Sequence, residues 1–320
     1  MATSYSFLRG QMLSRRIAGQ IPLLTLLLLC LVTALLTDRF LSPLNLSNLL
    51  VQSSIMAVIA IGMTFVVIGG GFDLSVGSTV ALSGCVAAMV MLKLGIAAGV
   101  AAGILAGAAV GLGNGLLVAG LGVNPFITTL GTMAMVRGLA FLLTGGAPVG
   151  DGELPAAFVA FGTGRLLGLH YLVWVPVLLL AVFSFVMRAT PFGRRIYATG
   201  GNREAAWLSG IDTARVIAST YVWCGALAGV AGVMLAARLQ SGQPTSGEFY
   251  ELTAIAAVVL GGASLAGGEG TLYKSVIGVL IMIVLGNSLN LLNVDSYWQR
   301  IAVGAVIIAA AAADRLRSRS

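Results

Sequence analysis

The sequence predicts an all-α integral membrane protein with about ten transmembrane helices. Of its 320 residues, 58% are hydrophobic and 9% are charged, and the mean hydropathy is +1.00. A soluble domain carries about 25% charged residues, so this chain has too few charges to cover a water-facing surface. Its apolar residues form long blocks of Leu, Val, Ile, Ala and Gly, which is not the alternation over about 10 residues expected of an outer-membrane barrel strand.

Ten apolar segments supply the helices in chain order. A helix rises about 1.5 Å per residue, so roughly 20 apolar residues cross a hydrocarbon core of about 30 Å. The eighth and tenth segments are short, and the full set is Ile21–Thr37, Leu49–Ile68, Val76–Leu92, Ile96–Val118, Phe126–Leu143, Tyr171–Met187, Val216–Ala237, Leu252–Leu265, Val276–Leu292 and Ile301–Ala313. Because no Pro/Ser-rich linker divides the chain, residues 1–320 are expected to form a single transmembrane domain.

The distribution of basic residues predicts the orientation. The first segment follows three arginines and no small-residue cleavage site follows it, so we expect an uncleaved signal anchor with its N-terminus inside. Ten spans then place these basic residues in the cytoplasm: Arg9, Arg15, Arg16, Arg188, Arg194, Arg195, Arg203, Arg215, Lys274, Arg315, Arg317 and Arg319. The outer side receives only Arg39, Lys93, Arg165, Arg238 and Arg300. This asymmetry obeys the positive-inside rule, and it puts both termini and the basic segment 188–215 in the cytoplasm.

Glycine recurs every four residues along the fourth segment. The positions are Gly99, Gly103, Gly107, Gly111 and Gly115, and Gly225 and Gly229 repeat the spacing in the seventh segment. Lipid gives helices no hydrophobic reason to associate, so close approach of small faces supplies van der Waals contact instead. We expect these glycines to pack helices closely; a smooth face on which helices slide is the alternative.

Asp73 is one of few carboxylates near a predicted span, and it follows three glycines that end the second segment. An Asp just before a new apolar run is typical of a helix N-cap. Two other interpretations stay open. Irregular backbone at membrane depth survives only where protein or water satisfies it, so this turn could line a polar path. Asp73 could also couple transport to protons, with Arg137 as its only evident partner.

Arg137 lies inside the fifth segment. A charge there costs at least about 2.5–3.5 kcal/mol on insertion scales, so the side chain must face protein or water. Either it pairs with carbonyls or a carboxylate and locks the bundle, or it borders the path of the substrate.

The residue types that catalysis or metal binding requires are isolated in this sequence. Three cysteines lie far apart in apolar blocks, and the single histidine, His170, has no metal-ligand neighbour at a suitable spacing. The glycine-rich stretch 261–270 lacks the Gly-Lys-Ser/Thr of an ATP-binding loop. Basic residues do not form a stripe interleaved with aromatics, as a nucleic-acid partner would need. We therefore predict no catalytic residue, metal or cofactor.

Four stretches of the chain form a recognisable pattern. They are Gly62–Ser78 (GMTFVVIGGGFDLSVGS), Pro125–Met133 (PFITTLGTM) with Arg137-Gly138, Tyr197–Asn202 (YATGGN) through Leu208–Ile211 (LSGI), and Tyr250–Leu252 (YEL) through Gly261–Gly268 (GGASLAGG). Together they resemble the permease subunits of bacterial ABC importers for monosaccharides, the ribose, xylose, arabinose and galactose group, and the ribose permeases in particular.

The resemblance implies a ten-helix permease of the vitamin-B12-importer type (type II) that dimerises around a central path, with a second copy or a paralogue. It also implies a cassette ATPase subunit on the cytoplasmic face, an extracytoplasmic sugar-binding protein and a bacterial cytoplasmic (inner) membrane. ATP hydrolysis would belong to the cassette subunit, so this chain is expected to be no enzyme. It would translocate a monosaccharide by alternating access.

In such importers a short cytoplasmic helix between the sixth and seventh spans seats in the cassette, and the resemblance places it at Asn202–Asp212. An apolar face of Ala205, Ala206, Trp207, Leu208 and Ile211, ringed by Arg203, Glu204 and Asp212, suits that role. The residues assigned to cassette coupling are Gly200, Gly201, Asn202, Glu204, Ala205, Leu208, Ser209 and Gly210. Those assigned to the signature and the substrate path are Gly70, Asp73, Ser75, Gly77, Asn124 and Arg137.

Two departures from the family pattern leave the identity of the sugar open. Thr253 stands where an aspartate is usual, and Tyr273-Lys274-Ser275 stands where small residues are usual. The alternative function is a proton- or sodium-coupled secondary transporter of a small polar solute, for which Asp73 is the candidate acid.

Overall fold

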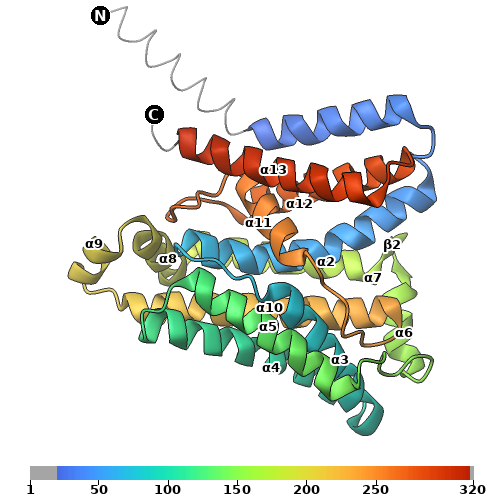
Figure 1. Cartoon of the computed structure of the whole chain (residues 1–320), viewed down its shortest axis with the longest axis horizontal. Coiled ribbons are helices and arrows are strands. Elements are labelled where there is room, and N and C mark those ends of the chain that lie inside the picture. Colours follow the sequence, from blue (N-terminus) through green and yellow to red (C-terminus); the bar gives the residue numbers. More distant parts are fainter. Residues whose placement is uncertain (1–19, 318–320) are drawn as a thin grey trace, which may run out of the picture.

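The computed structural model describes residues 20–317, with side chains as far as residue 312, and this part of the chain is almost entirely helical (Figure 1). Seven of the described helices are long and apolar enough to cross a membrane. They are α2 (Pro43–Ile68), α3 (Val76–Leu94), α4 (Ile96–Gly115) with its π-helical extension η1 (Leu116–Gly120), α5 (Pro125–Thr144), α7 (Tyr171–Ala189), α10 (Thr213–Leu239) and α12 (Leu272–Leu291). Four basic residues of the predicted topology, Arg9, Arg15, Arg16 and Arg319, lie outside the described residues.

Shorter elements complete the described chain. Three are apolar helices, Gln20–Leu36, α11 (Tyr250–Leu260) and α13 (Ser296–Arg317), whose apolar part ends at Ala312. The others are α6 (Ala156–Thr163), α8 (Pro191–Gly201), α9 (Arg203–Leu208) and an antiparallel hairpin of β1 (Arg165–Leu166) and β2 (Leu169–His170), in which Arg165 pairs with His170. Each of the ten predicted apolar segments overlaps one of these apolar helices.

The eighth predicted segment is wrong as a continuous span. Helix α11 has 11 residues, which at 1.5 Å per residue is about 16 Å, or half of a hydrocarbon core. The chain before α11 is irregular from Ser241 to Phe249, and the chain after it runs as a loop to Thr271. The helix ends early because Gly262 adopts a φ of 85°, which an α-helix does not allow, and Gly267, at 88°, prevents the helix from resuming within the predicted segment's flank.

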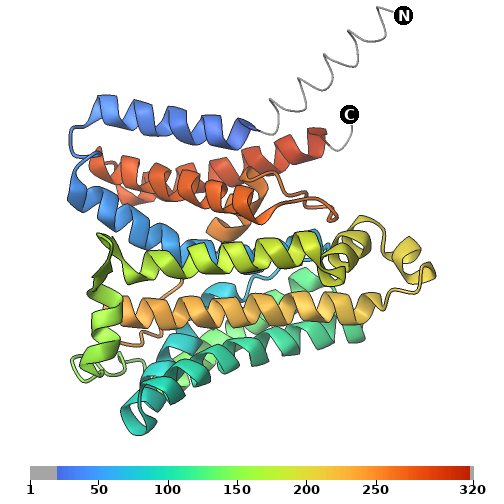
Figure 2. The same cartoon turned by 180° about the vertical axis from the view of Figure 1, so that it is seen from behind.

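Helix α2 lies at the centre of the bundle. All of its residues from Ser53 to Ile68 are buried, and α7, α10, α11 and α12 pack against it (Figures 1 and 2). Leucines of the helix Gln20–Leu36 are instead largely exposed, with Leu28 at 61%. Lipid tails are as apolar as leucine, so a lipid solvent permits an outer helix of exposed leucines.

The glycines of the fourth segment lie where α4 meets its neighbours. Gly99 and Gly103 face α3, while Gly107, Gly111 and Gly115 face α10, which runs alongside α4 (Figure 2). A Cβ atom added to any of the five would come within 3.0 Å of an atom of the facing helix. Gly107 of α4 lies against the backbone of Gly225 and Gly229 in α10, so the glycine-rich faces of the two helices pack against each other.

The two ends of the bundle differ in character. Helices α8 and α9 project from one end, and α6 with the β-hairpin closes the other (Figure 1). The segment 188–215, predicted to be cytoplasmic, and Arg165, predicted to lie outside, are therefore at opposite ends. Helix Gln20–Leu36 starts and α13 finishes toward the end that carries α8 and α9.

Candidate functional site

The projecting end is built from two capped helices. Helix α8 begins at Thr190-Pro191, where Pro191 occupies the first turn and the Thr190 hydroxyl accepts a hydrogen bond from the Gly193 N–H. Helix α9 begins after Asn202, whose Oδ1 accepts from the Ala205 N–H at 2.9 Å. Such caps satisfy N–H groups that lack partners within the helix. Asn202, assigned to cassette coupling from the sequence, thus sets where α9 starts.

Helix α9 is shorter than the predicted helix Asn202–Asp212. It ends at Leu208 because Gly210 adopts a left-handed φ of 82°. The Ile211 N–H then donates to the Ala206 carbonyl at 3.1 Å, and the Gly210 N–H donates to Trp207 at 2.9 Å, which is the Schellman arrangement that closes helices. Asp212 begins the next element, because its Oδ1 accepts from the Arg215 N–H at 3.0 Å at the start of α10.

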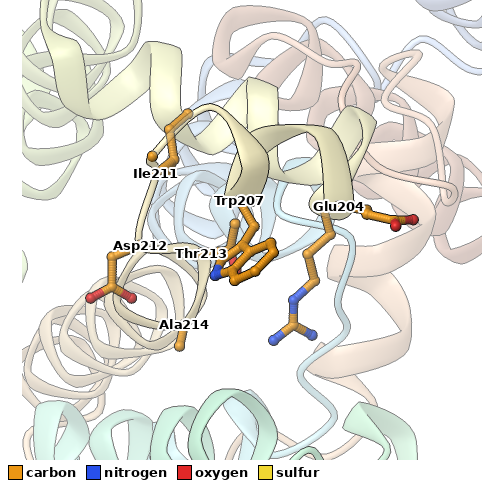
Figure 3. Close-up of a pocket in the computed structure, with 8 residues that line it drawn as sticks. Glu204, Trp207, Ile211, Asp212, Thr213 and Ala214 are labelled. Carbon is orange, nitrogen blue, oxygen red and sulfur yellow. The ribbon is translucent and has the colours of Figure 1, made fainter.

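Exposed apolar side chains occupy the tip of α9. Trp207 is 66% exposed and Leu208 72% exposed, while Ala206 is buried. A cavity of about 730 Å³ adjoins this tip, and Trp207 lies at the centre of the residues that line it (Figure 3). Its lining consists of Arg203, Glu204, Trp207, Gly210, Ile211, Asp212, Thr213 and Ala214. An exposed indole beside a charged, concave rim is typical of an anchor for a protein partner.

The projecting end touches the bundle interior through a glycine junction, which consists of Gly70, Gly200, Gly201, Gly267 and Gly268. The Gly268 N–H donates to the carbonyl of Ile68, the last residue of α2, at 2.8 Å. A Cβ on Gly200 would overlap that same carbonyl, and one on Gly267 would lie 2.9 Å from the Gly70 Cα. Gly201 has room, since its added Cβ would meet only the Gly268 Cα at 4.0 Å. The end of α8 and both glycine-rich stretches therefore meet at one point.

Asp73 lies 1% exposed in the irregular chain between α2 and α3. The N-cap residue of α3 is Ser75, two residues after the predicted Asp73. The Asp73 carboxylate nevertheless accepts from a backbone N–H at this helix start, that of Ser75 at 2.9 Å, and from the Ser75 hydroxyl at 2.6 Å. Asn114 of α4 donates to Ser75 Oγ at 2.9 Å and approaches the carboxylate at 3.4 Å. The Asn114 Oδ1 is buried without a hydrogen-bond partner in the described residues.

Gly77 joins this region to the irregular chain before α11. A Cβ there would overlap the Gly247 carbonyl and the Glu251 carboxylate. The stretch Gly62–Ser78 therefore packs against residues 247–251 through Gly77 and against Gly267 through Gly70.

Arg137 connects α5 to the same irregular chain. Its Nη1 donates to the carbonyls of Pro244 at 2.6 Å and Ser246 at 2.7 Å. Glu248 and Glu251 lie close enough to interact with the guanidinium electrostatically. The first of the two interpretations of Arg137, pairing with carbonyls, is the one that the structure shows, and Asp73 is not its partner.

Asn124 is not brought to these groups by any contact in the described chain. Its Oδ1 accepts from the Phe126 N–H at 2.9 Å and caps α5. Sequence reasoning missed two residues that do belong here, Asn114 and Glu251. Asn114 could have been found, because it is the only polar residue in the fourth apolar segment. Within the described residues, no group of three or more His, Cys, Asp and Glu side chains could hold a metal ion.

Comparison with known proteins places this architecture in a family. A family model described as "Branched-chain amino acid transport system / permease component" matches residues 45–311. The chain is 46% identical to the ribose import permease protein RbsC of Bacillus subtilis (strain 168), over 93% of this chain and 92% of that protein. It is 44% identical to RbsC of Escherichia coli K12, over 92% and 93% of the two chains.

A further relative is the L-arabinose transport system permease protein AraH of Escherichia coli K12, 39% identical over 90% of this chain and 87% of that protein. No solved structure matches the chain. These relatives confirm the resemblance to sugar-importer permeases, which are multi-pass membrane proteins and not enzymes. The chain belongs to the family of branched-chain amino acid transport system / permease components.

Proposed function

We propose that this chain is the transmembrane permease of an ATP-driven importer that carries a ribose-like monosaccharide into a bacterial cytoplasm through the inner membrane. Two cassette ATPases bind the end that carries α8 and α9, and an extracytoplasmic binding protein delivers the sugar at the end that carries α6 and the β-hairpin. The names and high identity of the relatives support the solute class. A pair of permease chains, identical or paralogous, encloses the path.

The observation that carries the proposal is the tip of α9. Trp207 and Leu208 expose most of their apolar surface at an end of the molecule that otherwise faces water. The basic residues of segment 188–215 orient this end toward the cytoplasm. Docking of α9 into a cassette would bury both side chains and leave Arg203 and Glu204 at the polar rim, which is the usual anatomy of a protein interface.

The glycine junction gives a route from the cassette to the path. A displacement of α8 is transmitted directly to the end of α2 and to the loop after α11, because Gly200 contacts both without intervening side chains. Those two segments adjoin the irregular chains at Asp73 and at Gly247. We infer that cassette closure moves these irregular chains and so alternates access.

Purification after gentle cross-linking in native cells tests the proposal. The wild-type chain is expected to bring down a cassette ATPase. Ala205 is exposed on α9, so Ala205→Trp should block docking without disturbing the fold, and it should lower ATPase recovery at least tenfold. Recovery of the chain alone, from both wild type and variant, would favour the ion-coupled secondary transporter and make Asp73→Asn the next variant to measure.

A further inference from the structure

A cavity of about 230 Å³ lies at the end of the bundle that carries the β-hairpin (Figure 1). It is formed between the start of α2, the hairpin and the start of α7, and we call it the hairpin cavity. Pockets that enclose a whole drug-sized ligand measure roughly 300–1,000 Å³, so this one suits the head of a larger molecule whose remainder lies outside. Its lining consists of Pro43, Leu46, Ser47, Leu50, Arg165, Gly168, Leu169, His170 and Val173.

Three polar side chains of the hairpin cavity contact one another. The Ser47 hydroxyl lies 3.1 Å from His170 Nε2 and accepts a hydrogen bond from Arg165 Nη2 at 3.4 Å. The other ring nitrogen of His170, Nδ1, is buried and has no hydrogen-bond partner among the described residues. Arg165 is exposed and forms no salt bridge with any described acid. Because polar groups inside a protein are normally hydrogen-bonded, this cluster has donors and a positive charge that the described chain leaves unmatched.

The unmatched groups favour a ligand that accepts hydrogen bonds and carries negative charge. A guanidinium only donates. When the Ser47 hydroxyl donates to His170 Nε2, a neutral imidazole carries its hydrogen on Nδ1, which then also donates. A phosphate group offers acceptor oxygens to both donors, and arginine is well suited to binding phosphate because its N–H groups form a planar fork.

The other walls of the hairpin cavity are apolar and lead toward the membrane interior. Leu46 and Leu50 of α2 are 39% and 38% exposed. Leu50 lies about 4.5 Å further along α2 than Ser47, in the direction of α8. Val173 extends this wall on α7, and Leu178 of the same helix is exposed beyond it. Lipid tails are as apolar as leucine, so acyl chains can cover these side chains, whereas a soluble anion cannot.

The hairpin has the composition of a segment at a membrane surface. Its turn consists of Leu167 and Gly168, both with positive φ, and Leu167 is 84% exposed. Trp174, in the first turns of α7, donates from its indole N–H to the Leu166 carbonyl at 3.3 Å. Tryptophan is enriched where a membrane meets water. These features place the hairpin cavity at the depth of the lipid head groups.

We propose that the hairpin cavity binds the head group of one anionic phospholipid of the surrounding bilayer. The phosphate accepts hydrogen bonds from Arg165 and His170, and the acyl chains lie along Leu46 and Leu50. A head group with net negative charge is preferred, because Arg165 gains less from a phosphate that is already neutralised by an ammonium group of the same lipid. The inference goes beyond the proposed function, and its test requires neither ATP nor sugar.

Native mass spectrometry of the delipidated full-length permease in detergent measures the binding directly. Phosphatidylglycerol and phosphatidylcholine with identical acyl chains are titrated separately, and the affinities for the first bound lipid are compared. We expect phosphatidylglycerol to bind about fivefold or more tightly than phosphatidylcholine. Equal affinities would show unselective contact with lipid and would overturn the proposal.

Two cavity variants and one control assign the contacts. Arg165→Gln removes the charge and should weaken phosphatidylglycerol binding about fivefold or more. His170→Gln keeps an amide near the position of Nε2, where it can reach Ser47, but removes Nδ1, and it should weaken binding about threefold or more. Arg39→Gln alters an exposed arginine that precedes α2 and does not line the cavity, so it should change nothing. An unchanged affinity in either cavity variant, or an equal loss in the control, would refute the site.

Two competitors distinguish a lipid from other occupants of the hairpin cavity. Millimolar inorganic phosphate should leave phosphatidylglycerol bound, because it lacks the chains that contact Leu46 and Leu50. Displacement by phosphate would identify a site for a soluble anion and overturn the lipid assignment. A saturating amount of the sugar-binding protein should also leave the lipid bound, and displacement would assign the cavity to that protein instead.

Discussion

Replacement of Arg137 by Met removes the guanidinium group that holds residues 244–246 against α5. The Nη1 atom donates to two carbonyls, of Pro244 at 2.6 Å and Ser246 at 2.7 Å. Met keeps most of the apolar length of the side chain and has no donor, so the change removes both hydrogen bonds and little packing.

Two opposing free-energy terms determine how much Arg137→Met changes the stability of the permease. Hydrogen bonds to charged groups are worth about 1.5–3 kcal/mol in soluble proteins, but interhelical ones in membranes average about 0.6 and reach about 1.7 kcal/mol. Two such bonds therefore stabilise the closed segment by about 1–3 kcal/mol. Removal of the charge also relieves an insertion cost of about 2.5–3.5 kcal/mol. We predict that Arg137→Met leaves the thermal midpoint of the purified permease nearly unchanged.

Arg137→Met should strongly increase the local opening of residues 244–250. A loss of about 1–3 kcal/mol raises the opening equilibrium about 5- to 150-fold, since 1.4 kcal/mol is a factor of ten. Amide hydrogen exchange measured by mass spectrometry reports this at Ser246 and Tyr250, whose N–H groups donate at 3.2 Å to Gln243 and Gly247. The control Arg195→Met alters an exposed arginine of α8 and should leave this exchange unchanged. Equal exchange of the segment in wild type and Arg137→Met would refute the reasoning.

Two glycine predictions have matched controls in the same helices. Gly200→Ala forces a Cβ into the Ile68 carbonyl, so this variant should abolish the coupling of cassette ATP hydrolysis to uptake while still inserting in the membrane. Gly201→Ala has open space around its Cβ and should keep at least half of wild-type coupling. Equal coupling in the two variants would contradict a role for the glycine junction. Gly107→Ala drives a Cβ into the α10 backbone and should cost about 1–3 kcal/mol in thermal or denaturant unfolding. The Cβ of Gly113→Ala meets nothing within 4 Å, so this variant should gain roughly 0.5–1 kcal/mol of unfolding free energy from improved helix propensity. Destabilisation by both Gly107→Ala and Gly113→Ala would show that close packing against α10 is not the cause of the loss.

Hydropathy was sufficient to locate the apolar helices, because lipid requires long apolar runs whose backbone is satisfied within the helix. It failed at the eighth segment, where composition stays apolar while the glycines at 262 and 267 take conformations closed to other residues. It also gave no sign of α6 and α8, which are too short to produce a span. For α8 a signal was present, since Thr190-Pro191 is a typical helix start.

The candidate site was predictable in its residue types but not in its partners. An acid near a span and an arginine within a span were evident from the sequence, yet Asp73 meets Asn114, 41 residues away, and Arg137 meets carbonyls more than 100 residues away. Backbone carbonyls carry no sequence signature, so no pattern could have indicated them. The predicted N-cap lies two residues too early for a local reason, because the turn at Leu74 and Ser75 precedes α3 and makes Ser75 its N-cap.

Uptake of labelled ribose into proteoliposomes distinguishes an ATP-driven importer from an ion-coupled transporter. The permease is reconstituted with its cassette ATPase and binding protein, ATP is enclosed on the cassette side, and ion gradients are abolished with ionophores. We predict uptake that requires ATP, persists without any proton or sodium gradient, and is lost when Ala205→Trp replaces the wild-type permease. Uptake that continues without ATP and stops when the proton or sodium gradient is dissipated would contradict it.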